Sequence, residues 1–398
     1  MEQTETSRTF DHHAAEFVDN PFPIYRELRE TCPVAHSEKY GGFWALTRYD
    51  DVHQAASDPT TFSSAIHGIT IPHMGAEGAP PMIPIEVDPP QHLKYRRLTL
   101  QLFTPGYLER WEEPTRRIVN DLLDQFQSTG KADFADDLCV PVPLTIITLM
   151  MGVPMEDRDK FKDWSVKLVQ LHHISPEVQK ETAEGLMGYF QLQIDDRRRN
   201  PGGDDLVSVL VRSEMDGRHL TDDEIQRYCF LLLLAGNETT TNGMGASLWY
   251  LAEHPQLRDR LIADPSLIGP AVEEFLRYFS PVQGLARTTT TDAHIDGVTI
   301  PAQERVLLLW ASANRDAEKF SSPDEFIAER KPNPHIAFGV GNHRCLGSNL
   351  ARLEMRVLLE EVLKRIPDYE IAGEVQWYSG ATRGLTHLPV TFSPQSKS

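Results

Sequence analysis

The stretch Phe338-Gly-Val-Gly-Asn-His-Arg-Cys-Leu-Gly347 places one cysteine, Cys345, in a loop with three glycines, and a helix-forming run follows at 348–355. Gly339 and Gly341 are free to adopt positive φ, so backbone N–H groups of the loop can converge on the sulfur. The N-terminus of the following helix would point its partial positive charge at the same atom. Such a loop stabilises a thiolate, and we predict that Cys345 is a ligand of haem iron.

Two other interpretations of this loop exist. A dinucleotide-binding G-x-G-x-x-G pattern starting at Gly339 would need glycine at position 344, where the chain has Arg344. A structural cysteine buried in an ordinary turn remains open on the loop alone. The other motifs of the chain argue against it.

Length and composition favour one large domain. The 398 residues contain no long linker, low-complexity stretch or internal repeat, and we divide them into a polar tail, 1–18, and a single domain, 19–398. The 58 acidic and 39 basic residues give a formal charge of −19, which argues against nucleic acid or an anionic membrane as partner. The most apolar window, 140–154, is proline-interrupted and shorter than the roughly 20 residues that span a bilayer. We expect it to be a core helix.

The N-terminus and the cysteines indicate a soluble cytoplasmic protein. Residues 1–20 are polar and acidic, with no basic and apolar regions of a signal peptide. The four cysteines are too widely spaced for a disulfide framework or a zinc site, and they are Cys32, Cys139, Cys229 and Cys345.

Helical periodicity dominates the chain, for example at 111–126 and 271–278. Strand-like alternation is limited to three places, 42–48, 294–301 with a turn at 296–297, and 388–392. The segment 197–205 is expected to be a loop whose arginines form a solvated surface. The fold class predicted is mainly α with a small β portion.

A second motif lies in the apolar run Leu231 to Asn242, where Gly236 is followed by an acid and three threonines. An acid inside an apolar helix is costly unless something compensates for it. Glycine and back-bonding threonine hydroxyls loosen the helix locally, which opens a notch for a small ligand. The alternative is an N-cap cluster between two shorter helices.

The two motifs together resemble those of the cytochromes P450. The pattern Phe-x-x-Gly-x-His-x-Cys-x-Gly is the haem-ligand signature of that family, and every position of it is filled between Phe338 and Gly347. The resemblance extends over about residues 19–392. It implies a cytochrome P450 fold with haem b buried between the I-type and L-type helices. Residues that border the haem by this resemblance are Phe338, Gly339, Ala235 and Gly236.

The resemblance also assigns roles to the acid and the threonine of the notched helix. Residues 235–240 match the family motif Ala/Gly-Gly-x-Asp/Glu-Thr-Thr. Glu238 and Thr239 would be the acid–alcohol pair that supplies protons for O–O bond cleavage.

Cations for the two haem propionates are also implied by the resemblance. His92 and Arg96 lie at i, i+4 on one helix face and match a family His-x-x-x-Arg pair. Arg287 and His343 complete the set. Each could alone be an ordinary surface cation.

A structural triad is implied on the cysteine side of the haem. Glu274 and Arg277 are spaced for an ion pair on one helix face and match the family motif Glu-x-x-Arg, with Arg330 as third member. Alone, such a pair is a common feature of solvated helix surfaces.

The substrate pocket is expected to be lined mostly by apolar residues. By resemblance it involves the loop 62–84, the segment 168–174, the notched helix, the segment 282–285 and the hairpin near 381–382. The residues assigned to it are Leu234, Ala235, Val282, Gln283, Leu285, Ala381 and Thr382. This lining suggests a lipophilic guest, either a terpenoid, a steroid-like ring, a fatty acid, an aromatic acid or a secondary metabolite.

Electrons are expected from a separate protein, because the sequence has no flavin, nicotinamide or iron–sulfur motif. We expect an acidic ferredoxin, supplied by its own reductase, to dock on a basic surface composed of Lys94, Arg97, Arg344 and Arg352.

The function predicted is a haem-thiolate monooxygenase that inserts one oxygen atom from O2 into a lipophilic substrate, most simply as a hydroxylation. The nearest alternatives are a peroxygenase or nitric-oxide reductase on the same fold. A haem-binding sensor or carrier, and a helical scaffold without cofactor, are alternatives from other classes.

Overall fold

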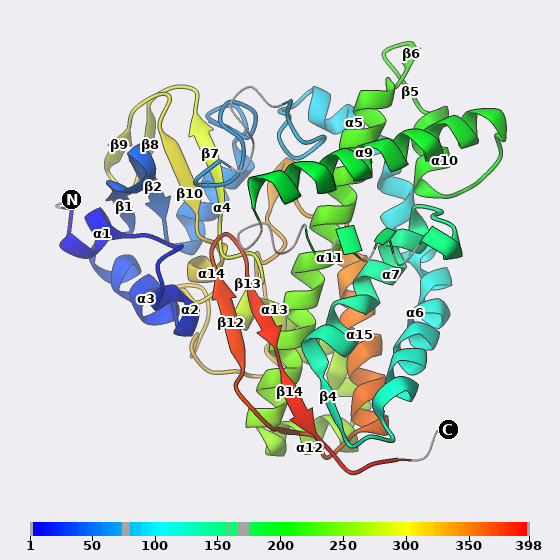
Figure 1. Cartoon of the computed structure of the whole chain (residues 1–398). Helices are drawn as coiled ribbons and strands as arrows, with labels where there is room; N and C mark the ends of the chain where they lie inside the picture. The colour runs from blue at the N-terminus through cyan, green and yellow to red at the C-terminus, as the bar shows by residue number, and fades with distance from the viewer. Residues whose placement is uncertain are drawn as a thin grey trace.

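The computed structural model describes residues 3–73, 80–157, 160–161, 163–164, 167 and 175–395. Figure 1 shows a helical body beside a smaller sheet region, to which the N-terminal segments and a later part of the chain contribute. The predicted class, mainly α with a small β portion, is confirmed. The longer helices are α3 (Phe22–Thr31), α4 (Tyr49–Ser57), α5 (Gln91–Thr99), α6 (Pro105–Phe126), α7 (Pro141–Met150), α9 (Pro176–Arg199), α10 (Leu206–Arg212), α11 (Asp222–Glu253), α12 (Pro255–Ala263), α13 (Ile268–Phe279) and α15 (Ser348–Arg365).

The central helix is α11, which runs unbroken for 32 residues, or about 48 Å. Its start is fixed by a capping box: the Thr221 side chain accepts from the Glu224 N–H, and the Glu224 carboxylate accepts from the Thr221 N–H. The helix continues through Leu231–Asn242, so the alternative of two shorter helices is excluded. Buried residues of α6, α11, α13 and α15 form the largest apolar core.

The main sheet has the strand order β1-β2-β10-β7-β3. It combines β1 (Val34–Ser37), β2 (Phe43–Leu46) and β3 (Phe62–Ser63) with β7 (Leu285–Thr289) and β10 (Arg305–Leu308). Only the β10–β2 pairing is parallel. The short α14 (Trp310–Ala313) follows β10. The sheet therefore ties the N-terminal part of the chain to the segment that carries Arg287.

Smaller strand pairs complete the β portion. The predicted turn at 296–297 joins β8 (Ala293–Ile295) to β9 (Val298–Ile300), with positive φ at both turn residues. Strand β14 (Pro389–Thr391) lies between β11 (Glu370–Ile371) and β4 (Lys131–Asp133), and β5 (Glu214–Met215) pairs with β6 (Arg218–His219). The hairpin of β12 (Gln376–Ser379) and β13 (Arg383–His387) lies against α11.

The segment before residue 19 contains α1 (Glu5–Thr9) and α2 (Glu16–Asp19). Phe10 and Phe17 of this segment are buried in an apolar cluster with residues of α3 and the main sheet. The domain boundary placed after residue 18 stays a prediction, but this segment is packed rather than solvated.

The expectation of a loop with solvated arginines at 197–205 is wrong for its first residues. Helix α9 continues to Arg199, and the side chain of Arg197 is only 14% exposed. Its guanidinium donates to the Gly152 carbonyl at 2.6 Å and to the Gln193 side chain at 2.7 Å. Arg197 thus fastens α9 to the turn after α7, because a buried guanidinium needs acceptors.

Among the residues described, no helix is long and apolar enough to cross a membrane. The apolar window 140–154 contains α7, whose residues are mostly buried, as expected of a core helix.

Candidate haem-thiolate site

The cysteine loop adopts the backbone that its glycines predict. Gly339 and Gly341 have φ of +66° and +68°. The Cys345 N–H donates to the Phe338 carbonyl at 2.8 Å, which closes the loop. A Cβ on Gly341 would lie 2.7 Å from the Ala56 carbonyl oxygen, so glycine is required there for two reasons.

The side chain of Cys345 is accessible, or uncovered, although it lies deep within the protein. It is the one exposed cysteine of the four, yet burial raises the pKa of its thiol. A side chain that is both uncovered and enclosed borders a cavity. The Gly347 N–H and the cations of Arg96 and Arg352 act on the pKa in the opposite direction. Helix α15 starts at Ser348 without a side-chain cap, so its first N–H groups remain free to favour an anion.

The notch in α11 has the features expected of it. Thr239 and Thr240 donate to the carbonyls of Ala235 and Gly236, at 3.0 and 3.4 Å. Ala235 is exposed halfway along this otherwise largely buried helix, and Leu234 beside it is half-buried. No side chain of the described residues therefore covers the helix at Ala235.

Two arginine and two histidine side chains gather where partners for the propionates were predicted. The rings of His92 and His343 lie 4.0 Å apart between centroids, and the two histidines and Arg96 and Arg287 influence one another's charge. Burial and the two arginines lower the pKa of His92 to about 4. Burial lowers the pKa of Arg287 to about 10.

This cluster fits a ligand that carries carboxylates. Arg287 is 4% exposed, and its guanidinium donates a hydrogen bond to the backbone carbonyl of Ala286. The buried His92 Nδ1 has no hydrogen-bond partner. Buried cations and donors without partners are costly, and two propionates would supply the missing acceptors. The donor set and the thiol of Cys345 therefore fit haem.

Glu238 is held by the C-terminal hairpin. Its Oε1 accepts hydrogen bonds from the Tyr378 hydroxyl at 3.0 Å and the Thr382 hydroxyl at 2.5 Å. The Tyr378 hydroxyl also lies 2.9 Å from the Asn242 side-chain oxygen. Gly384 makes room for this contact, since a Cβ there would overlap Asn242. Burial and the charge of Glu238 raise the pKa of Tyr378 well above its usual value.

The structural triad forms a buried ion-pair network. Glu274 and Arg277 have fully buried side chains and are joined by two bonds of 2.8 Å. The Arg330 Nε contacts both carboxylate oxygens of Glu274 at 3.1 Å. The guanidinium groups also donate to carbonyls of the loop 314–325, so the network anchors that loop to α13.

The predicted pocket residues lie in three segments that the structure brings together. Val282 forms an isolated bridge with Thr382, and the Gln283 N–H donates to the Ala381 carbonyl at 2.8 Å. The Gln283 side chain donates to the Phe279 and Ser280 carbonyls and accepts from Tyr25, so its polar atoms are already engaged. Leu285 is half-buried at the start of β7. Residues 74–79 of the loop 62–84 and the segment 168–174, both assigned to the pocket, lie outside the described residues.

Two contacts of the site had no sequence signal. Ser64 lies 3.3 Å from His343 Nε2 across 279 residues of sequence, and Tyr378 reaches Glu238 across 140. Neither residue belongs to a local motif.

Comparison with known proteins agrees with this geometry. Residues 45–366 match the family model described as Cytochrome P450. The chain is 37% identical to Cytochrome P450 130 of Mycobacterium tuberculosis, covering 97% of this chain and 98% of that one. It is 38% identical to the Vitamin D(3) 25-hydroxylase of Pseudonocardia autotrophica, over 99% of both chains. Among solved structures, CYP109E1 of Bacillus megaterium in complex with testosterone has a TM-score of 0.84 and 35% identity, covering 94% and 99% of the two chains.

Proposed function

The chain belongs to the cytochrome P450 family of haem b monooxygenases, and from this membership we propose that it hydroxylates a lipophilic substrate of steroid-like shape. The observation that carries the proposal is the uncovered Cys345 thiol together with the buried Arg287, which forms no ion pair with the described residues, and the unpartnered Nδ1 of His92. The substrate class is supported by the names of two similar proteins, a vitamin D(3) hydroxylase and a structure with bound testosterone.

The haem, when bound, would supply the activation of O2 and the transfer of one oxygen atom to the substrate. Cys345 would hold the iron as a thiolate, stabilised by the Gly347 N–H and the start of α15. Phe338 and Gly339 on one side, and Ala235 and Gly236 on the other, would border the macrocycle. His92, Arg96, Arg287 and His343 would bind the two propionates.

Glu238 and Thr239 would manage the protons. Thr239 keeps its hydroxyl on the helix by donating to the Ala235 carbonyl, next to the uncovered part of α11. Glu238 would exchange protons with solvent and pass them toward that hydroxyl. Tyr378 and Thr382 restrict the carboxylate to one arrangement, so it is positioned before the reaction. This acid–alcohol pair favours O2-dependent chemistry over a peroxygenase or a nitric-oxide reductase.

The pocket above the haem would be formed by Leu234, Ala235, Val282, Leu285, Ala381 and Thr382, with Gln283 behind them. The test is an optical titration of the ferric protein with testosterone, vitamin D3, palmitate and benzoate, followed by product analysis. We expect saturable spin-state shifts with the first two compounds and a singly hydroxylated product. A shift with palmitate or benzoate only would refute the substrate class, and absence of haem would refute the haem-thiolate site.

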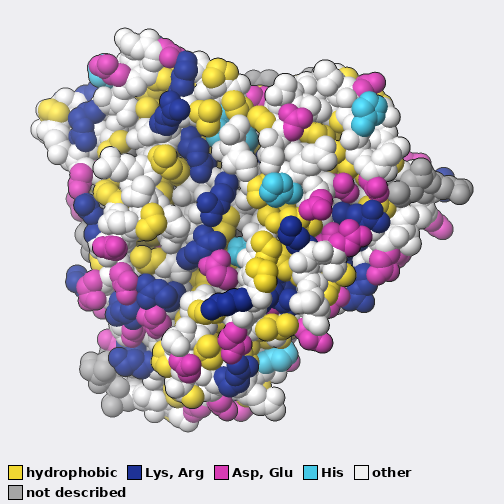
Figure 2. All heavy atoms as spheres, turned by 180° about the vertical axis from the view of Figure 1, so that it is seen from behind, with side chains coloured by type: hydrophobic (Ala, Val, Ile, Leu, Met, Phe, Trp, Pro, Cys, Tyr) yellow, Lys and Arg dark blue, Asp and Glu magenta, His cyan; other side chains and the backbone are white. Residues whose placement is uncertain are grey.

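The electron donor would be an acidic ferredoxin. Figure 2 shows a column of lysine and arginine side chains down one face of the molecule, flanked by acidic groups. Of the four predicted docking residues, Lys94 pairs with Asp216 at 2.7 Å and Arg352 with Glu273 at 2.6 Å. Arg97 and Arg344 are exposed and form no ion pair with the described residues. They would therefore contribute most to docking.

The docking role is tested by charge reversal. Arg97→Glu and Arg344→Glu should slow reduction by an acidic ferredoxin about tenfold at low salt, with an unchanged substrate titration. Arg199→Glu, an equal charge change at the end of α9, is the matched control. Equal rates in all three variants would refute the docking surface.

We also infer a cytoplasmic location, since all four cysteines are free thiols.

A further inference from the structure

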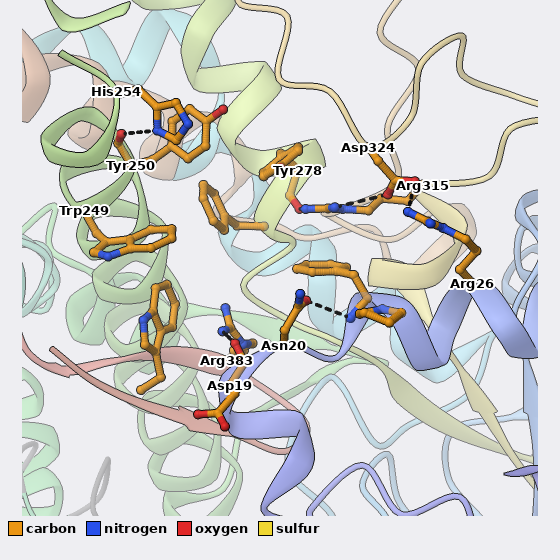
Figure 3. Close-up of a pocket in the computed structure, with 14 residues that line it drawn as sticks. Asp19, Asn20, Arg26, Trp249, Tyr250, His254, Tyr278, Arg315, Asp324 and Arg383 are labelled. Atoms are coloured by element: carbon orange, nitrogen blue, oxygen red, sulfur yellow. Dashed lines mark hydrogen bonds and ion pairs between the residues drawn. The ribbon is translucent and has the colours of Figure 1, made fainter.

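A cleft of about 350 Å³ lies between the N-terminal segment and the C-terminal hairpin (Figure 3). Its walls come from residues 19–26, the last turns of α11, the end of α13, the loop 315–324 and the hairpin β12–β13. Trp249 at its edge follows Glu238 by eleven residues on α11, or about 16 Å along the helix axis. The cleft is therefore a different site from the proposed haem and substrate pocket beside Ala235, which is called the haem chamber below.

Aromatic rings line this cleft. Trp249 and Trp377 meet edge to face, with centroids 5.1 Å apart and planes at 89°. On the other side, the guanidinium of Arg315 lies 3.5 Å from the ring centroid of Phe22 and 3.8 Å from that of Tyr278. Such walls suit a flat aromatic ring, which gains both buried area and ring–ring contacts.

The charges of the cleft do not balance. Three arginines and two aspartates line it, and Asp324 is shared by Arg26 at 2.5 Å and Arg315 at 3.3 Å. Figure 3 shows the other carboxylate, that of Asp19, turned away from the guanidinium of Arg383. One of the three cations therefore forms no ion pair with the described residues.

That cation is Arg383, which is 7% exposed and lies over the Trp377 ring at 4.0 Å. Its Nη2 donates to the backbone carbonyls of Val18 and Asp19, while its buried Nε has no partner. Among the described residues no hydrogen bond uses its Nη1. Figure 3 shows the guanidinium pointing into the cleft beside Asn20.

An anion in the cleft would relieve an electrostatic cost. Burial lowers the pKa of Arg383 to about 10 and the nearby charge of Arg315 acts in the same direction, while Tyr25 and the Asp19 carboxylate oppose this shift only in part. Both groups still carry their charges at neutral pH. A carboxylate beside them would supply both acceptors and a compensating charge, in the bidentate geometry that guanidinium favours.

We propose that this cleft is a second ligand site, which binds a flat aromatic carboxylate with its ring among Trp249, Trp377 and Tyr278 and its carboxylate on Arg383. The site is independent of the monooxygenase reaction. Its charge and its rings are both required, so a neutral arene and an inorganic anion should each bind more weakly.

The test uses the haem-loaded protein with the chamber blocked by 4-phenylimidazole, a ligand of haem iron. Calorimetric titration with 2-naphthoate should show one site, with no change in the haem spectrum and with quenching of tryptophan fluorescence. Binding of 2-naphthamide and of inorganic phosphate should be at least tenfold weaker. No binding of 2-naphthoate at millimolar concentration, or equal binding of the amide, would overturn the proposal.

Two variants locate the site. Arg383→Gln should weaken 2-naphthoate at least tenfold. Asn20→Asp adds a competing carboxylate at the cleft while keeping the side-chain oxygen that accepts from the Phe22 N–H, so it should weaken binding without disturbing the core. Arg26→Gln, on an exposed arginine already paired with Asp324, is the control and should change affinity less than twofold. Unchanged affinity in Asn20→Asp would refute the site even if Arg383→Gln does not fold. Steroid titration in the unblocked protein tests the proposed function separately.

Discussion

Removal of one hydroxyl, in Tyr378→Phe, tests whether the hairpin positions Glu238, the proposed catalytic acid. The hydroxyl lies 3.0 Å from the Glu238 carboxylate and 2.9 Å from the Asn242 side-chain oxygen. It has a single proton, so it donates to only one of them. The charged carboxylate is the stronger acceptor, and an Asn242 side chain flipped by 180° would donate to the tyrosine through its otherwise unpartnered Nδ2. The hydroxyl therefore links Asn242 to Glu238.

The magnitude follows from the loss of one bond to a charged group, about 1.5–3 kcal/mol. If half of that energy fixes the carboxylate, proton delivery slows by roughly threefold to twelvefold, since about 1.4 kcal/mol corresponds to a factor of ten. Thr382 still holds Glu238, so the loss should be partial. We expect product formed per reductant consumed to fall by a similar factor, with hydrogen peroxide making up the difference.

The assay measures reductant consumption, product and peroxide together, in H2O and in D2O. The solvent isotope effect should rise in Tyr378→Phe, because proton delivery then limits the rate more strongly. A merely structural role would not change it. Tyr189→Phe removes a comparable tyrosine–carboxylate bond, to Asp157 at 2.7 Å, on α9 and serves as control. Unchanged product yield and isotope effect in Tyr378→Phe would refute the positioning role.

Three further changes have definite expected outcomes. Thr239→Ala should keep substrate binding but divert most reductant to peroxide, and coupled hydroxylation at the normal yield would contradict its proton-delivery role. Glu274→Gln leaves two buried guanidinium groups without their carboxylate, so it should lower the free energy of unfolding by about 3–5 kcal/mol in urea titrations. The control is Glu329→Gln, which removes a carboxylate from an exposed ion pair and should lower that free energy by less than about 1 kcal/mol. Burial raises the pKa of Asp51 from 3.8 to about 6, so ionisation of Asp51 destabilises the folded state increasingly between pH 4 and 6. Asp51→Asn should therefore raise the free energy of unfolding at pH 7 more than at pH 4. An equal effect at both pH values would contradict the burial argument.

Local sequence was sufficient where a residue's role depends on its own backbone. The positive φ of Gly339 and Gly341 follows from glycine being placed where the loop must turn around a sulfur. The hydroxyl-to-carbonyl bond of Thr239 depends only on a residue four positions earlier in the same helix. Such features are visible in a short window, and the structure has them where they were predicted.

Features that depend on distant packing could not be predicted in the same way. The composition of residues 1–18 indicates a polar tail, but Phe10 and Phe17 find an apolar cluster made of α3 and the main sheet. Arg197 belongs to an arginine run whose composition indicates a solvated surface, but it is largely covered because the turn at Gly152, 45 residues earlier, supplies one of its acceptors. In each case the deciding partner lies far away in sequence.

The hairpin β12–β13 shows how one element serves two sites. Successive side chains of a strand point to opposite faces. Tyr378 contacts Glu238 on the α11 side, while its neighbour Trp377 lines the aromatic cleft. After the turn, Thr382 contacts the same carboxylate and Arg383 enters the cleft. Consecutive residues of one hairpin therefore belong to two separate sites, because Thr382 holds the Glu238 carboxylate while Arg383 faces the cleft.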